Sequence, residues 1–165
     1  MQINDKEREE LLNELNDLSD EEINRKPSDN EWSIQQILEH LYLMEGGITQ
    51  TIAHQLATGE EKKVADKPIE LSVNRSTKVQ APPFAVPTED FRSLAELQTK
   101  LLQSHEALRK FVHQSRAADL EKKAYPHPVF GDLNLKQWIP FIAYHEMRHT
   151  EQLKEVKDKL GLTHS

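Results

Sequence analysis

Apolar residues recur with a helical period in four long segments, and this pattern limits the fold more than any other feature of the sequence. The segments cover roughly residues 3–17, 33–58, 88–114 and 134–160. In each of them leucine, isoleucine and other apolar side chains return every three or four residues, which places them on one face of a helix. No stretch between the segments reads clearly as a strand. The sequence therefore predicts an all-α four-helix bundle.

The connections between these segments are long. Ser33 and Gln36 have the chemistry of a capping box at the start of the second helix, and Gly59 is its expected end. Residues 59–87 contain four prolines and form an unusually long connection for a compact domain. They predict either a crossover between distant ends of the bundle or a flap over a site. A second proline-rich connector, AYPHPVFGDLN, precedes the fourth helix, so a simple meander with tight turns is not expected.

Composition narrows the function classes. The formal net charge is −7, so binding of nucleic acid through phosphate neutralisation is not expected. The chain has no cysteine, which excludes disulfides, cysteine-bound zinc, iron–sulfur clusters and a thiolate nucleophile. The first residues lack the apolar core of a signal peptide, and no run of about 18 apolar residues is present. We therefore expect one domain, residues 1–165, in the cytoplasm and not in a membrane.

The most distinctive motif is HEMRH, which matches the H-E-x-x-H pattern of zinc proteases. Its histidines, His145 and His149, are separated by about 40° of rotation and about 6 Å of rise on a helix, so both rings can reach one ion. A metzincin would require glycine and histidine where the chain has Gln152 and Glu155. A thermolysin-like enzyme takes its third ligand from a later helix, and little chain follows this one. The sequence therefore argues against a protease.

The glutamate of HEMRH is accordingly not expected to act as a catalytic base. Glu146 is rotated by about 100° from His145, so it is expected to face solvent or a neighbouring helix. The best third metal ligand is His40, at the edge of the apolar stripe of the second helix. Bundles build metal sites from side chains on facing helices. Three histidines leave coordination positions open for water or substrate, as catalytic sites do.

The remaining histidines are weaker candidates. His54 is about 21 Å beyond His40 on the same helix axis, too far to share a site. His105 lies near an apolar stripe and is expected to be a core or boundary residue, and His127 is a candidate for lining the mouth of a pocket. His113 and His164 are expected at the surface. A histidine on an apolar face is more often a hydrogen-bonded core residue than a ligand, so an interaction protein without metal stays an alternative.

Three stretches of the chain resemble the DinB-like superfamily, and within it the YfiT-like and bacillithiol-transferase-like branch. They are E-W-S-I-x-x-I-L-x-H-L at 31–41, H-P-x-F-G-x-L at 127–133 and W-x-x-F-x-x-x-H-x-x-x-H-x-x-Q-L at 138–153. The resemblance covers about residues 5–158. It implies a four-helix bundle, a homodimer, and a divalent metal such as zinc or nickel. Its ligands would be His40, His145 and His149, with water completing the coordination.

The resemblance leaves the reaction open. The leading hypothesis is a metal-dependent enzyme acting on small electrophiles, either a hydrolase or an S-transferase that uses a low-molecular-weight thiol. A bound ion would lower the pKa of a water molecule toward ~7, or deprotonate the thiol. No organic cofactor is expected, and no general base is assigned, because Glu45 and Tyr144 are suggested by helical offset alone. The alternative is a non-catalytic metal- or ligand-binding dimer of a stress response.

Overall fold

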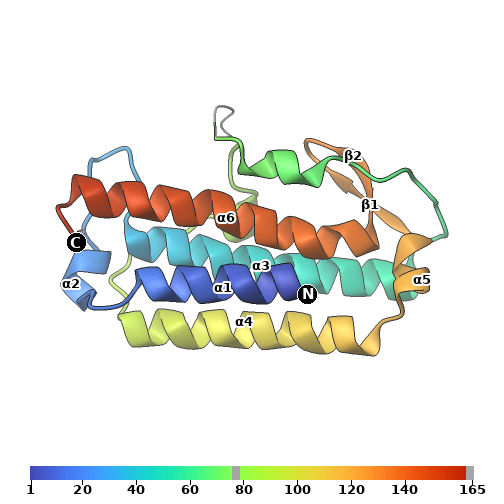
Figure 1. Cartoon of the computed structure of the whole chain (residues 1–165), viewed down its shortest axis with the longest axis horizontal. Coiled ribbons are helices and arrows are strands. Elements are labelled where there is room, and N and C mark those ends of the chain that lie inside the picture. Colours follow the sequence, from blue (N-terminus) through green and yellow to red (C-terminus); the bar gives the residue numbers. More distant parts are fainter. Residues whose placement is uncertain (76–78, 163–165) are drawn as a thin grey trace.

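The chain forms a bundle of four long helices, shown in Figure 1 for the computed structural model, which describes residues 1–75 and 79–162. Short helices and one hairpin join them. In chain order the elements are α1 (Gln2–Glu14), α2 (Asp20–Ile23), α3 (Ile34–Thr58), the 3₁₀-helices η1 (Ile69–Val73) and η2 (Pro83–Ala85), α4 (Leu94–Gln114), α5 (Ala117–Glu121), β1 (Ala124–His127), β2 (Gly131–Asn134) and α6 (Leu135–Lys159). The predicted four-helix bundle is confirmed.

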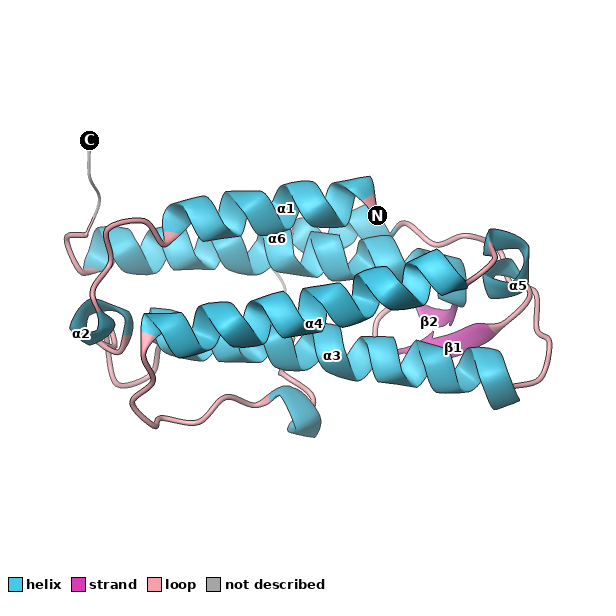
Figure 2. Ribbon diagram, turned by 90° about the horizontal axis from the view of Figure 1, so that it is seen from below, coloured by secondary structure: helices cyan, strands magenta, loops and turns pink. Residues whose placement is uncertain are grey.

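The bundle contains a long crossover. Helices α1 and α6 lie side by side and run in the same direction, and so do α3 and α4, whereas the two pairs run in opposite directions (Figure 1, Figure 2). Helix α3 also packs against α6. Because α3 and α4 are parallel, the chain that joins them has to return along the bundle. Residues 59–87 are thus part of a crossover, one of the two alternatives that the sequence leaves open.

Side-chain caps fix where the long helices begin. The hydroxyl of Ser33 accepts a hydrogen bond from the backbone N–H of Gln36, and the side chain of Gln36 accepts one from the N–H of Ser33. This is the predicted capping box of α3. Asn134 caps α6 in a similar way, by accepting from the backbone N–H of Gln137. Both helices therefore start where the sequence predicts.

The third long helix begins later than the sequence predicts. The predicted start is Thr88 or Glu89, but α4 begins at Leu94, after the N-cap residue Ser93. Phe91, which the helical period places on the apolar stripe, precedes the helix and is exposed. The prediction is wrong because one turn of loop can match a helical period by chance. The cap is the better signal, since it satisfies backbone N–H groups that have no partner within the helix.

A β-hairpin precedes α6, and the sequence did not predict it. Strands β1 and β2 pair antiparallel, with Ala124 opposite Asn134 and His127 opposite Gly131. Gly131 has a φ of 71°, in the left-handed region that glycine adopts readily. Pro126 lies inside β1, and a proline usually argues against a strand because it cannot donate to the ladder. It is tolerated here because each strand of a two-stranded sheet is an edge strand.

Two apolar clusters fill the bundle, and a polar layer lies near their boundary. On α3, Leu41 belongs to the first cluster and Met44 to the second; on α4, Leu101 and Leu108 mark the same change. Polar side chains from all four long helices are buried near this boundary, each at most 8% exposed: Arg8, His40, Glu45, Ser104, His105 and Glu146. Buried polar groups are costly unless they are paired, so the layer constrains how the four helices meet.

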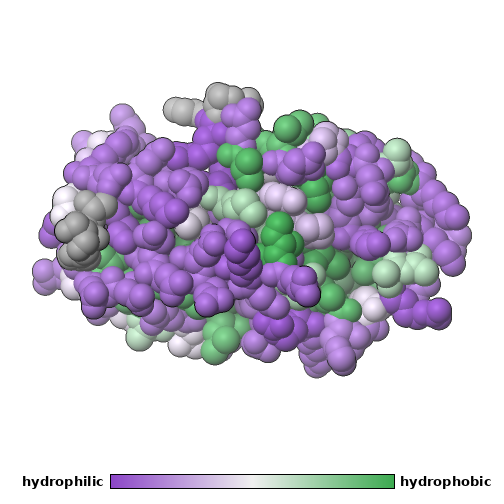
Figure 3. Space-filling model, viewed as in Figure 1, coloured by the Kyte–Doolittle hydropathy of each residue, from purple (hydrophilic) through white to green (hydrophobic). Residues whose placement is uncertain are grey.

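The outer surface is mostly hydrophilic on the face shown in Figure 3, with apolar side chains gathered near the middle. In Figure 1 this is where η1 lies over α6, and the two elements are in contact. The η1 residues Leu71 and Val73 are exposed. Among the helices that the structure describes, none combines the length and the apolar composition needed to cross a bilayer.

Candidate metal centre

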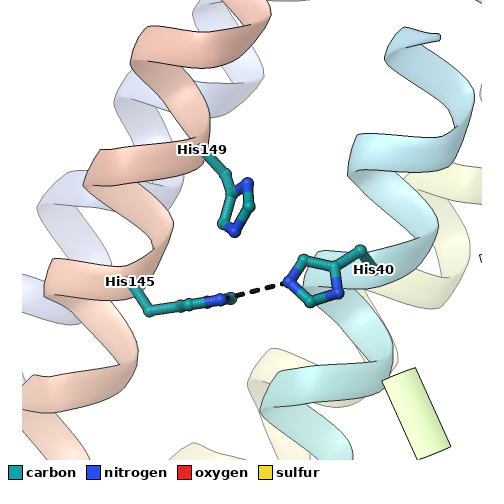
Figure 4. A group of neighbouring side chains, drawn as sticks. All are labelled: His40, His145 and His149. Carbon is teal, nitrogen blue, oxygen red and sulfur yellow. Dashed lines mark hydrogen bonds between the residues drawn. The ribbon is translucent and has the colours of Figure 1, made fainter. Parts of the chain in front are cut away.

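His40, His145 and His149 face one another across the space between α3 and α6 (Figure 4). One ring nitrogen from each lies within 4.8 Å of the other two. Nε2 of His40 is 3.1 Å from Nε2 of His145. Two histidine nitrogens that share a tetrahedral zinc ion lie about 3.4 Å apart, given Zn–N bonds of about 2.1 Å. The structure therefore brings together the three histidines that the sequence analysis selects, with a spacing that suits one divalent metal ion.

Hydrogen bonds orient two of the three rings. Nδ1 of His40 lies 2.8 Å from the carbonyl oxygen of Ala85 in η2, and Nδ1 of His149 lies 2.8 Å from Oε1 of Gln152. Each Nδ1 faces an acceptor, so each carries the ring proton and donates it, which leaves Nε2 free to bind a metal. Acceptors of this kind typically fix the tautomer of metal-binding histidines and raise their basicity. Sequence reasoning did not identify the Ala85 carbonyl, because nothing in the period of α3 locates it.

Electrostatics also favour the metal-binding form of these histidines. Burial lowers the pKa of His40. Burial also lowers the pKa of His149 to about 3, and repulsion from a charge on His40 lowers it further. The pKa of His145 is likewise well below its ordinary value, because of burial and then the two neighbouring histidines. Metal ions bind the neutral imidazole. At neutral pH the cluster presents three uncharged nitrogen ligands.

The indole of Trp32 covers one side of the cluster. Its ring stacks on His149 with centroids 6.2 Å apart, and it lies 5.1 Å from the ring of His40. Trp32 directly precedes the cap residue Ser33, so the start of α3 is fixed next to the site. On the other side, η2 rests on α3, where a β-carbon at Gly47 would overlap the ring of Phe84. The cluster is thus bordered by the segment that precedes α3, by η2 of the crossover and by α6.

Glu146 faces neighbouring helices and not solvent, which decides between the two orientations that the sequence allows. Its carboxylate accepts hydrogen bonds from the Arg8 guanidinium of α1, at 2.8 Å to Oε1 and 3.3 Å to Oε2. Arg8 also donates to Oε1 of Glu45 at 3.0 Å and to the carbonyl oxygen of Leu101 at 2.8 Å. Burial raises the pKa of Glu146, against the lowering effect of Arg8. The glutamate of HEMRH therefore joins helices.

The other histidines lie outside the cluster. His54 and His113 are exposed, as expected for His113. His105 is buried, and its two ring nitrogens lie 2.9 Å from Oε2 of Glu45 and 2.8 Å from Oδ1 of Asp5. This confirms the prediction of a core or boundary residue. His127 is buried in β1 and belongs to no group of metal ligands among the described residues. His164 lies outside the described part of the chain.

The pairing of His105 predicts a pH dependence of stability. Burial alone would lower its pKa, but hydrogen bonds to Glu45 and Asp5 and the charge of Glu45 raise it above the ordinary value. Protonated His105 therefore stabilises the folded state at pH values below its unfolded pKa, and this contribution is lost as the pH rises through the folded pKa. We expect the stability advantage of wild type over His105→Gln, measured by urea unfolding, to be larger at pH 5.5 than at pH 9. Equal advantages at both pH values would contradict a charged His105.

Replacement of Gln152 tests the orientation of His149. Gln152→Leu removes the acceptor of Nδ1 and is expected to weaken binding of zinc about 10- to 100-fold, the usual cost of losing such an acceptor. Gln152→Glu keeps an acceptor and should bind zinc at least as tightly as wild type. The measurement is competition with a chromophoric chelator. A Gln152→Leu variant with unchanged affinity would show that this hydrogen bond does not position the ring.

Comparison with known proteins shows the family of this chain. A model of the DinB superfamily matches residues 4–153. The uncharacterized protein YuaE of Bacillus subtilis (strain 168) is 37% identical over 160 residues, which cover 97% of this chain and 98% of YuaE. Two solved structures have a similar fold. TT2238, a four-helix bundle protein, has a TM-score of 0.64 at 19% identity, over 93% of this chain and 94% of its own.

The second structure is YfiT from Bacillus subtilis, described as a probable metal-dependent hydrolase with an unusual four-helix bundle topology. Its TM-score is 0.66 at 12% identity, over 98% of this chain and 86% of YfiT. Identities this low show a common fold and no more. The family model, by contrast, spans most of the chain, and YuaE matches it almost from end to end. The chain belongs to the DinB superfamily.

Proposed function

We propose that His40, His145 and His149 hold one divalent metal ion, zinc or nickel, and that the protein is an enzyme acting on a small electrophilic substrate. The observation that carries the proposal is a set of three imidazoles whose ligand atoms lie within 4.8 Å of one another, with no carboxylate in the group among the described residues. Three protein ligands are the arrangement of catalytic sites, because a fourth position stays open for a reactant. Closed structural sites use four.

Transfer of a small thiol is the reaction that demands least of the surrounding side chains. A bound divalent ion lowers the pKa of a coordinated thiol or water. Glu45, which helical offset suggests, and Glu146 of HEMRH are paired with Arg8 and are not free to act as a general base. In the proposed reaction the thiol sulfur bonds to the electrophilic carbon, the leaving group departs with the bonding electrons, and the thiol proton passes to solvent. The chain has no cysteine, so the thiol is a cosubstrate.

Hydrolysis is the second candidate, and the likeness to YfiT favours it, because that protein is described as a probable metal-dependent hydrolase. In this case water would take the place of the thiol. The same three histidines would be required. The site then differs only in which small molecule occupies the open coordination position.

Turnover by metal-loaded protein tests the proposal. Zinc- and nickel-loaded wild type would be assayed with cysteine and 1-chloro-2,4-dinitrobenzene, which releases chloride as the C–S bond forms, and with a panel of esters. We expect turnover that is abolished by a chelator, restored by the ion and absent in His149→Ala. Bound metal without turnover in either assay would favour a non-catalytic binding protein. Activity that survives His149→Ala would contradict a metal-dependent enzyme.

We further propose that the protein is a homodimer, as the family resemblance implies. The crossover carries exposed apolar side chains that such a contact would cover: Leu71, Val73, Phe84 and Val86. Light scattering coupled to size-exclusion chromatography should give twice the 19.1 kDa of the chain. A monomer at micromolar concentration would contradict it.

A further inference from the structure

His127 is a buried polar group that the metal centre does not use. It ends β1 and is 8% exposed. Its ring lies among three aromatic side chains, with centroids 4.9 Å from Phe130, 5.1 Å from Trp138 and 4.5 Å from Phe141. A histidine in such apolar surroundings needs a partner for each ring nitrogen, because an unpaired buried polar group costs free energy.

One of the two nitrogens has its partners. Nδ1 of His127 accepts hydrogen bonds from the backbone N–H groups of Val129 and Phe130, at 3.0 and 3.3 Å, in the turn of the hairpin. A nitrogen that accepts carries no proton, so the ring proton is on Nε2. Burial lowers the pKa of His127 to about 4, which keeps the ring neutral near pH 7. The hairpin therefore fixes one tautomer, with a single N–H donor on the far side of the ring.

That donor has no protein partner within residues 1–75 and 79–162. The fully buried side-chain polar atoms without a hydrogen-bond partner in this part of the chain are Oδ1 of Asn4 and Nε of Arg92. Nε2 of His127 is not among them, so solvent reaches it although the rest of the ring is enclosed. A fixed donor among apolar side chains is the kind of polar group by which small-molecule sites orient a ligand.

His127 lies one aromatic ring away from His145 of the metal centre. Trp138, Phe141 and His145 follow one another along the same face of α6, and about 10 Å of helix separates the first from the last. The ring of Phe141 lies between the other two rings: it contacts His127, and its centroid is 6.1 Å from that of His145. The two histidines are close enough that a positive charge on His127 would lower the pKa of His145. A small molecule bound at the three histidines would have to extend past one aromatic ring, that of Phe141, to meet the Nε2 donor.

We propose that Nε2–H of His127 donates a hydrogen bond to an oxygen acceptor of the substrate, a carboxylate or carbonyl group carried on a short apolar chain next to the metal-binding atom. The inference rests on the proposed function, because it requires a ligand at the three-histidine centre. It names a substrate class: small molecules that combine a sulfur or oxygen atom for the metal with a second, acceptor oxygen a few bonds away. The apolar chain would run along the rings of Trp138 and Phe141, which pack against each other.

Two variants separate the donor from the hairpin. In His127→Asn the amide oxygen stands where Nδ1 was, so it can still accept from the turn N–H groups, but no donor reaches the position of Nε2. In His127→Gln the amide N–H₂ reaches that position and keeps a donor there. The exposed His113→Asn, on α4, is the matched control for loss of an imidazole.

The probes are 3-mercaptopropionate, which has a thiol and an acceptor carboxylate, and 1-propanethiol, which has a similar chain without the acceptor. Each would be titrated under argon into cobalt-substituted protein, with binding followed by the sulfur-to-cobalt charge-transfer absorption. We expect wild type and His113→Asn to bind 3-mercaptopropionate more tightly than 1-propanethiol. In His127→Asn the ratio of the two dissociation constants should fall about 10-fold, the effect of losing one hydrogen bond to a charged group. His127→Gln should keep most of the preference.

The outcomes distinguish this inference from the proposed function. If both thiols bind and the ratio of their dissociation constants is the same in wild type and His127→Asn, the role of His127 is overturned and the metal centre stands. If His127→Asn and His127→Gln lose the preference equally, the effect belongs to the hairpin and the inference also fails. Protein that binds no cobalt, or binds it without an absorption change on addition of either thiol, contradicts the open metal site itself.

Discussion

Replacing His149 by alanine is expected to abolish stoichiometric metal binding. Wild type incubated with zinc or nickel and then dialysed should retain about one equivalent, because three neutral nitrogens converge on one point. His149→Ala leaves two ligands and should retain less than about a tenth of an equivalent, a larger effect than the 10- to 100-fold cost of losing an outer hydrogen bond. Elemental analysis of tag-free protein measures this directly.

The same variant should lose the stabilisation that the metal provides. An ion present at 100 times its dissociation constant adds about 2.7 kcal/mol to the folded state, which raises the melting temperature of a chain of this size by about 5–10 °C. We expect this rise in wild type and in His113→Ala, whose side chain is exposed, and no rise in His149→Ala. His40→Ala should behave as His149→Ala does. Metal retained by His40→Ala would show that α3 supplies no essential ligand, and metal retained by His149→Ala would show that the site does not need His149.

How far the sequence predicts this site depends on how local each contact is. The pair His145 and His149 follows from the geometry of a single helix, so spacing alone identifies it. His40 comes from another helix, and hydrophobic periodicity gives the face of a helix but not its axial position against a neighbour. His40 was the best candidate because it lies at the edge of an apolar stripe, the family resemblance implied the same ligand, and the structure places its ring beside the other two. The carbonyl of Ala85 comes from a loop, where no periodic signal exists, and could not be predicted.

The fold shows the same division. Helix starts marked by Ser33 and Asn134 could be predicted, because a cap is a contact between residues close in the chain. The hairpin could not, because Pro126 argues against a strand and only the edge position makes it acceptable. Arg8 lies in a charged stretch that reads as a solvent-exposed face. Its burial became visible only with the partners that three other helices provide.

Replacing Arg8 by methionine is expected to destabilise the fold more than any substitution in the apolar clusters that keeps a side chain of similar size. Arg8 is 5% exposed, and it lies between the carboxylates of Glu45 and Glu146, themselves 1% and 3% exposed. Its removal leaves two buried carboxylates close together without the positive charge that pairs with both of them. The carbonyl of Leu101 also loses the Arg8 donor. Breaking a buried ion pair by removing one partner costs about 3–5 kcal/mol. For a chain of this size the melting temperature should fall by about 10 °C.

The cause of this loss can be separated from lost packing. In Arg8→Met the carboxylates protonate more readily, so the deficit relative to wild type should shrink as the pH falls from 8 to 5. The double variant Arg8→Met/Glu146→Gln removes one of the two stranded charges and should recover part of the stability. Arg25→Met, at an exposed arginine, is the control and should change the melting temperature little. A deficit that is independent of pH and is not relieved by Glu146→Gln would mean that Arg8 contributes through its apolar stem, and that the polar layer does not depend on its charge.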